Sequence, residues 1–189
     1  MKIKYNAPTI LTYALFCAAV MAVTLYLLPG LASWFMVPGK GNFSPSSLRN
    51  WVSLLTHAAG HSGWSHLLAN FSLILLIGPM LEESYGSLAL LVMIVITALV
   101  TGVLNVLFFP APLMGASGVV FMMILLASFT NFSRGEIPLT FLFVVVLFLG
   151  DQLLKSMNAG TVSVSYFAHI AGGFCGSLFG FLFPPKRFS

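Results

Sequence analysis

Long apolar runs, separated by short polar stretches, dominate the pattern of this chain. A membrane-spanning helix needs about 20 mainly apolar residues, and the runs that reach or approach this length predict six such helices. The predicted spans cover residues 10–28, 64–81, 88–109, 117–132, 137–154 and 164–183. The first run follows a basic N-terminal start, but from Ile10 to Leu28 it is longer than the apolar core of a signal peptide. We therefore expect an all-α membrane protein whose first helix is a genuine span.

The first and second spans are joined by a long connection, residues 29–63, that is broken by several prolines and glycines. Within it, the stretch "SLRNWVSLLTH" has an amphipathic pattern that places Trp51, Leu54 and Leu55 on one side of a short helix. Tryptophan is typical of the membrane interface. The pattern predicts a long first loop that lies at the membrane surface.

The fourth span is shorter than the others. From Ser117 to Phe132 it has about 16 residues, which gives a helix of roughly 24 Å, less than the hydrocarbon thickness of about 30 Å. If its far end reaches the surface near Arg134, its N-terminus starts below the opposite surface. The preceding "FPAPLMG" would dip inward as non-helical backbone, which is tolerated in a membrane only inside protein or beside a wet cavity. We expect Ser117 at a submerged helix N-terminus that faces a polar recess.

Composition supports the membrane assignment and narrows the function. Hydrophobic residues make up 59% of the chain and charged residues 6%, whereas soluble domains have about 25% charged residues. The 189 residues fit a single domain, 1–189. The net charge of +4 comes from few, dispersed residues, so nucleic-acid binding is not expected. Cys17 and Cys175 lie in apolar runs and are expected to be buried, reduced thiols.

The distribution of basic residues predicts the orientation. With six spans, one side carries Lys2, Lys4, Arg134, Lys186 and Arg187. The other side carries only Lys40, Arg49 and Lys155. This bias places both termini in the cytoplasm and the long first loop outside.

Several polar side chains fall inside the apolar runs. His66 and Asn70 are four residues apart, so they share one face of the second span. His169 lies a few residues inside the sixth span. A charged group at such depth costs at least about 2.5–3.5 kcal/mol, and a neutral histidine still needs a partner. A serine at a helix start, a histidine and a His/Asn pair are the parts of a hydrolase, because histidine can activate a hydroxyl as general base.

Each of these features also has a purely structural interpretation. Ser117 lies between Gly115 and Gly118, and small residues allow close helix packing. The His66/Asn70 pair could make an interhelical hydrogen bond, and His169 could be a buried histidine with a satisfied partner.

Two further histidines, His57 and His61, are expected to shape the rim of the first loop. A metal site is not expected, because no Cys or carboxylate accompanies the histidines at ligand spacing.

Three segments together carry a family resemblance. "HSGWSHLLAN", "GASGVV" and "AHIAGGFCG" resemble the signature segments of the rhomboid family of intramembrane serine proteases, in the order and spacing of its compact six-helix bacterial form. No single segment is decisive, since G-x-S-G alone is common. The three on the second, fourth and sixth spans are specific, and the resemblance covers nearly the whole chain.

The resemblance implies a catalytic dyad and an oxyanion hole. Ser117 would be the nucleophile and His169 the base, with no acidic third member. The oxyanion hole would consist of the Ser117 backbone N–H, His66 and Asn70, whose donors would stabilise the negative charge of the intermediate.

The family pattern also assigns supporting residues. Gly172 and Gly176, with Gly180 continuing the spacing, would let the sixth helix approach the fourth closely. Glu82, in "EESYGS", would be a structural tie and not a catalyst.

The sequence departs from the family pattern at two places. The family usually shows Trp-Arg near the "LLTH"-like stretch, whereas here Trp51 has no following Arg. One helical turn after the nucleophile the family commonly has Tyr; here Phe121 keeps the ring and lacks the hydroxyl.

The resemblance implies a six-transmembrane-helix rhomboid bundle that cleaves single-span transmembrane protein substrates in the lipid bilayer, without a cofactor. It implies a multi-pass protein of the bacterial cytoplasmic membrane whose active site opens to the outside. Two alternatives remain at this stage: a catalytically silent rhomboid-like protein that binds membrane clients, and a small transporter. A transporter would predict broken helices in matching halves, and the sequence shows one broken element, near 109–116. Oligomeric state is not indicated.

Overall fold

Helices are the regular secondary structure of the part of the chain that the structure describes. The computed structural model describes residues 4–129, 139, 141–147, 150, 164–183 and 185. Over these residues there is no strand, and one isolated bridge pairs Val37 with Leu113. Among the described residues, three helices are long and apolar enough to cross a membrane: α1 with its π-helical extension (Pro8–Leu27), α3 (Trp64–Tyr85) and α4 (Ser87–Phe108). The prediction of a multi-pass helical membrane protein is confirmed.

Most predicted spans coincide with helices. α1 (Pro8–Ala22) begins with a proline in its first turn, where the missing N–H costs nothing, and continues as the π-helical turn η1 (Val23–Leu27). α3 runs four residues past the predicted 64–81, and α4 matches the predicted 88–109 within one residue. The final helix, α7 (Val164–Leu182), matches the predicted 164–183. Half of the predicted fifth span, 137–154, lies outside the described residues.

The fourth predicted span is too long. The helix found there, α5 (Ser117–Ala127), ends five residues before the predicted end at 132. Its last turn tightens, because the backbone N–H groups of Ser128 and Phe129 donate to the carbonyls of Leu125 and Leu126. Residues 128–133 read "SFTNFS", and Ser, Thr and Asn compete for backbone hydrogen bonds and favour turns over helix. The predicted shortness of this helix is nonetheless correct.

The first loop contains the predicted amphipathic helix and two short 3-10 segments. α2 (Leu48–Thr56) follows η2 (Pro29–Phe35), and η3 (His57–Ala59) leads toward α3. Leu54 is buried, whereas Trp51 and Leu55 are exposed. Of the three residues predicted on one side of α2, one is therefore buried.

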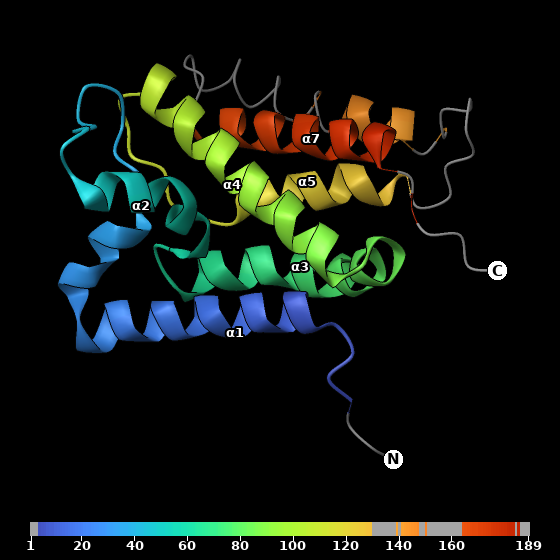
Figure 1. Ribbon diagram of the computed structural model, residues 1–189, viewed down its shortest axis with the longest axis horizontal. Helices are drawn as coiled ribbons and strands as arrows, with labels where there is room; N and C mark the ends of the chain where they lie inside the picture. Colours follow the sequence, from blue (N-terminus) through green and yellow to red (C-terminus); the bar gives the residue numbers. More distant parts are fainter. Residues whose placement is uncertain are drawn as a thin grey trace.

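The helices form a bundle in which α1, α3, α5 and α7 lie side by side and α4 crosses them (Figure 1). A continuous apolar core joins these helices; fully buried members include Ile10, Ile74, Leu90 and Met122. The free thiols of Cys17 and Cys175 are buried, as expected. Large apolar side chains such as Leu76 and Leu88 are exposed on the outside of the bundle, which suits a surface that faces lipid hydrocarbon.

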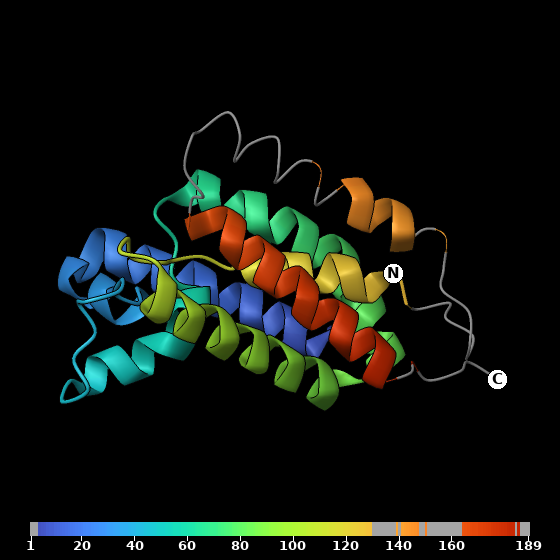
Figure 2. The same cartoon turned by 90° about the horizontal axis from the view of Figure 1, so that it is seen from above.

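One end of the bundle collects most of the non-helical backbone. The starts of α3, α5 and α7, the end of α4, and the first loop with α2 all lie there, at the left in Figures 1 and 2. The segment between α4 and α5 is not helical and is tied to the first loop: Val37 and Leu113 exchange two backbone hydrogen bonds of 3.0 Å. The loops at this end therefore form one hydrogen-bonded layer over the helix starts.

Candidate active site

Ser117 is the first residue of α5, and its side chain is half-buried at the end of the bundle that carries the loops. The first helical bond of α5 joins the Val120 N–H to the Ala116 carbonyl at 2.9 Å. The N–H groups of the preceding turn, including that of Ser117, therefore have no acceptor within the helix. They also carry the positive end of the helix dipole, so negative charge that develops beside Ser117 would be stabilised.

Gly115 brings the second span next to the start of α5. Its φ of +132° is a conformation that side chains rarely adopt. A β-carbon at this position would lie 2.7 Å from Cε1 and 2.8 Å from Nε2 of His66, and 3.9 Å from Nδ2 of Asn70. Glycine is thus required twice, for the backbone angle and for the close approach. His66 and Asn70 both face the backbone that leads into Ser117.

The hydrogen-bond donors of His66 and Asn70 are arranged for a role beyond helix packing. Nδ1 of His66 lies 3.1 Å from the Ser62 hydroxyl, which orients the ring and leaves Nε2 toward Gly115. Asn70 is 7% exposed, and its Nδ2 has no hydrogen-bond partner among the described residues. A buried donor without a partner costs about 1–3 kcal/mol. An oxygen of a bound substrate beside Gly115 would satisfy it.

α5 and α7 meet through glycine. A β-carbon on Gly172 would overlap the carbonyl of Gly118, and one on Gly176 would overlap the carbonyl of Met122. Four residues further along α7, one on Gly180 would overlap the ring of Phe129. The four-residue spacing keeps these glycines on one face of α7, so the two backbones touch along their length.

This contact brings the two ends of the proposed dyad together. A β-carbon on Gly118 would lie 3.4 Å from the Ala168 carbonyl oxygen. Gly118 follows Ser117 and Ala168 precedes His169, so the serine and the histidine start from neighbouring backbone. His169 is half-buried in α7, and its ring lies against Phe121 with a centroid distance of 4.3 Å and an interplanar angle of 35°.

A third histidine, His61, lies next to His66. His61 is 6% exposed; its Nδ1 lies 3.3 Å from the Ala59 carbonyl, and its ring meets that of His66 edge-on at 5.1 Å. Burial, with a smaller contribution from His66, lowers the pKa of His61 to about 4. Within the part of the chain that the structure describes, no three His, Cys, Asp or Glu side chains gather closely enough to hold a metal ion.

Glu82 lies at the opposite end of α3 and takes no part in this cluster. Its two carboxylate oxygens accept the backbone N–H groups of Thr9 (2.9 Å) and Ile10 (3.0 Å). These are orphan donors of the first turn of α1. Glu82 therefore ties the start of α1 to the end of α3.

The first loop is braced by Trp51 without a following arginine. The indole N–H donates to the Pro45 carbonyl at 2.9 Å, and the ring of Phe43 packs edge-on against it at 5.2 Å.

Sequence reasoning missed a polar stripe on α4. Thr97, Thr101 and Asn105 are all buried, and they follow one another at four-residue spacing in an otherwise apolar helix. The Asn105 amide donates to the carbonyls of Pro38 (3.3 Å) and Ala111 (3.2 Å), so it joins the first loop to the segment before α5. The spacing was visible in the sequence and could have indicated a buried polar face.

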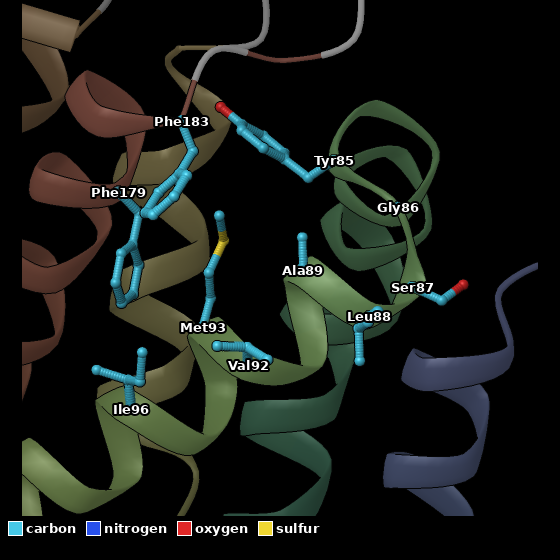
Figure 3. Close-up of a pocket in the computed structure, with 10 residues that line it drawn as sticks. All are labelled: Tyr85, Gly86, Ser87, Leu88, Ala89, Val92, Met93, Ile96, Phe179 and Phe183. Atoms are coloured by element: carbon cyan, nitrogen blue, oxygen red, sulfur yellow. The ribbon is translucent and has the colours of Figure 1, made fainter.

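A separate apolar groove of about 560 Å³ lies at the other end of the bundle (Figure 3). It is bounded by the turn between α3 and α4, by one face of α4 and by Phe179 and Phe183. Phe179 is ten residues past His169, which is about 15 Å along α7. The groove is therefore distinct from the cluster around Ser117, and its lining includes no histidine.

Comparison with known proteins assigns the chain to a family. Residues 48–186 match the model of the rhomboid domain. The chain is also similar to RHOMBOID-like protein 7 of Arabidopsis thaliana, with 32% identity over 137 residues, which covers 68% of this chain and 42% of the plant protein. The chain thus spans less than half the length of that relative.

Proposed function

Because the chain belongs to the rhomboid family, which includes serine intramembrane proteases, we propose that it is an intramembrane serine endopeptidase. It hydrolyses a peptide bond in or near a transmembrane segment of its substrate. The observation that carries the proposal is the contact between Gly118 and Ala168, since these residues adjoin Ser117 and His169 on two helices that touch.

In this mechanism Ser117 attacks the carbonyl carbon of the scissile bond while His169 takes its proton. The tetrahedral intermediate collapses when His169 gives that proton to the leaving amide nitrogen, and an acyl-enzyme remains on Ser117. A water then attacks the acyl carbon with His169 as base, and the proton returns to Ser117 as the acid product leaves. Phe121, whose ring is tilted against that of His169 with a centroid distance of 4.3 Å, limits the orientations of the imidazole.

The oxyanion would be held by the Ser117 N–H, Nε2 of His66 and Nδ2 of Asn70. The unpartnered Asn70 donor and the close approach of His66 to Gly115 support this assignment. Preorganised donors of this kind each contribute about 2.7–4 kcal/mol to transition-state stabilisation.

The substrates we propose are single-span membrane proteins with helix-destabilising residues. A peptide bond in a helix is shielded, so the substrate must unwind locally before Ser117 can reach it. α1 begins and α7 ends at the same end of the bundle (Figure 1), which favours an even number of spans. We propose six, with both termini in the cytoplasm and the site opening to the outside.

The test is to label the purified protein with a fluorophosphonate probe, beside Ser117→Ala, His169→Ala and Asn70→Ala. Ser128→Ala is the matched control, because Ser128 follows the same helix and lies away from His169. We expect wild type and Ser128→Ala to label, Asn70→Ala to label more slowly, and the other two not to label. Cleavage of a single-span reporter in proteoliposomes should follow the same order.

Two results would contradict the proposal. Equal labelling of wild type and Ser117→Ala would mean that the probe reads another residue. Folded wild-type protein that neither labels nor cleaves a panel of single-span reporters would favour the catalytically silent, client-binding function.

A further inference from the structure

His57 is the most enclosed histidine of the protein and has no role in the proposed dyad or oxyanion hole. It begins the short segment η3 between α2 and α3, and it is 1% exposed. Burying a polar ring costs free energy unless both of its nitrogens are hydrogen-bonded. The hydrogen bonds of its ring and of its backbone carbonyl connect it to the segment that precedes Ser117.

The backbone carbonyl of His57 accepts the N–H of Gly115 at 2.9 Å. This bond fixes the residue whose open side faces His66 and Asn70, two positions before the nucleophile. The bond is made at a backbone angle open to glycine, since Gly115 has a φ of +132°. The position of the proposed oxyanion hole relative to Ser117 thus depends on where the His57 carbonyl lies.

The imidazole of His57 fixes that carbonyl by bonding to two helices. Nδ1 lies 3.2 Å from the Ser53 carbonyl of α2, and Nε2 lies 3.3 Å from the Thr101 hydroxyl of α4. A carbonyl only accepts, so Nδ1 carries the proton and Nε2 accepts from Thr101. The single Thr101 hydroxyl proton is shared with two backbone carbonyls of α4, those of Thr97 (2.9 Å) and Ala98 (3.0 Å). Burial lowers the pKa of His57 to about 4, which keeps the ring neutral and this pattern intact near pH 7.

Thr101 also connects His57 to α5, the helix that begins with Ser117. A β-carbon on Gly118 would lie 3.0 Å from the Thr101 methyl group, so α4 contacts α5 at the residue after Ser117. A β-carbon on Gly102, the next residue of α4, would lie 3.2 Å from Cε1 of His57. The imidazole is therefore held between α2 and α4 with little room to move.

We propose that His57 is a positioning residue for the reaction at Ser117. Its imidazole, bonded to Ser53 and Thr101, fixes its own carbonyl, and that carbonyl holds Gly115 so that His66 and Asn70 point at the substrate carbonyl. The inference rests on the proposed function and deepens it. It assigns to His57 an effect on the chemical step, with substrate binding left unchanged.

The test measures kcat and KM separately for cleavage of a single-span reporter, and the rate at which a fluorophosphonate labels Ser117. The variants are His57→Leu, which removes both ring bonds, and His57→Asn, whose amide can still donate to Ser53. Misplacing a catalytic group by about 1 Å costs up to about a hundredfold in rate. We expect His57→Leu to lower kcat and the labelling rate about ten- to a hundredfold with KM within about twofold, and His57→Asn to recover part of the loss.

Glu82→Gln serves as the stability-matched control. It removes a tie at the far end of the bundle, so it lowers the unfolding temperature without touching the loop before Ser117. If His57→Leu loses no more kcat than Glu82→Gln at equal folded fraction, the ring is only structural and the proposal is wrong.

Thr101→Val and Thr101→Ser decide the matter if His57→Leu does not fold. Valine keeps the shape and the methyl contact but cannot donate to His57, whereas serine keeps the hydroxyl. We expect a several-fold fall in kcat at constant KM for valine and recovery for serine; unchanged kcat in Thr101→Val overturns the proposal. If this inference is wrong, the wild type and the His57 variants will be labelled at equal rates. A failure of the proposed function leaves all of them, wild type included, unlabelled.

Discussion

Gly172 of α7 packs directly on the carbonyl of Gly118 in α5, with no space between them for a single methyl group. This contact sets the distance between the helices that carry Ser117 and His169. It is a contact between backbones, so it is rigid, and it holds together the two helices that carry the proposed dyad.

We expect Gly172→Ala to impair both stability and catalysis. The added methyl overlaps backbone, which cannot move aside as a flexible side chain would, and overpacking of this kind costs about 1–3 kcal/mol. The helices must separate, so Ser117 labelling should fall more than the folded fraction does. The measurements are thermal unfolding in detergent and the fluorophosphonate labelling rate, with Gly30→Ala as the control because its β-carbon meets open space. Wild-type behaviour of Gly172→Ala would mean that the two helices are not in contact there.

Glu82→Gln should destabilise the protein while leaving the chemistry of the folded fraction unchanged. The carboxylate accepts two backbone N–H groups, and glutamine would turn an NH₂ group toward one of them. Hydrogen bonds to a charged acceptor contribute about 1.5–3 kcal/mol, and we expect a loss in that range. Thermal unfolding checks the stability, and labelling per folded molecule checks the chemistry. A large fall in labelling per folded molecule would instead connect this end of the bundle to the site.

The helices and their order could be predicted from the sequence because each depends on local pattern. The apolar runs predicted the start of α3 and both ends of α4 within one residue, and the breaker-rich "FFPAPLM" stretch correctly preceded a helix that starts at Ser117. The glycine spacing on the last helix anticipated its contact with the fourth predicted span, since small residues at four-residue intervals have few other uses in a membrane.

What could not be predicted rests on backbone atoms. The bond from the Gly115 N–H to the His57 carbonyl and the pairing of Val37 with Leu113 join segments far apart in the chain. Every residue carries the same N–H and C=O groups, so such pairs leave no mark in the residue types. The end of α5 was misjudged for a related reason: apolar content suggested continued helix, whereas the hydroxyl and amide side chains after Ala127 favour a turn.

Phe121 should be required for its ring and not for a hydroxyl. Its ring lies 4.3 Å from that of His169, and aromatic pairs contribute about 0.5–1.5 kcal/mol beyond burial. If this energy orients the imidazole, Phe121→Leu should lower kcat/KM about two- to tenfold, whereas Phe121→Tyr should stay within about twofold of wild type. Reporter cleavage measures both. Full activity in Phe121→Leu would show that His169 is oriented by other contacts.

The stability of the protein should fall as the pH falls from about 6.5 to about 4. His57 and His61 are both buried outside the spanning helices, and burial lowers the pKa of each to about 4, whereas an unfolded, hydrated histidine titrates near 6.5. Between these pH values the two histidines are protonated in the unfolded state and neutral in the native state. Lowering the pH therefore favours unfolding. At about 1.4 kcal/mol per pKa unit, each ring accounts for a loss of ~3 kcal/mol, which is complete by about pH 4. Unfolding midpoints in mixed micelles between pH 4 and 7.5 measure this loss.

Single replacements separate the two rings. His57→Asn and His61→Asn should each remove a comparable share of the pH dependence, because each removes one group whose native pKa lies below its unfolded value. Leu76→Ala, on the lipid-facing side of α3, should lower or preserve the midpoint equally at all pH values, since it removes no titrating group. A wild-type midpoint that is flat between pH 4 and 6.5 would mean that both rings already take up protons in the native loop. In that case the assignment of His57 as neutral and protonated at Nδ1, on which its bond to Thr101 depends, would also be wrong.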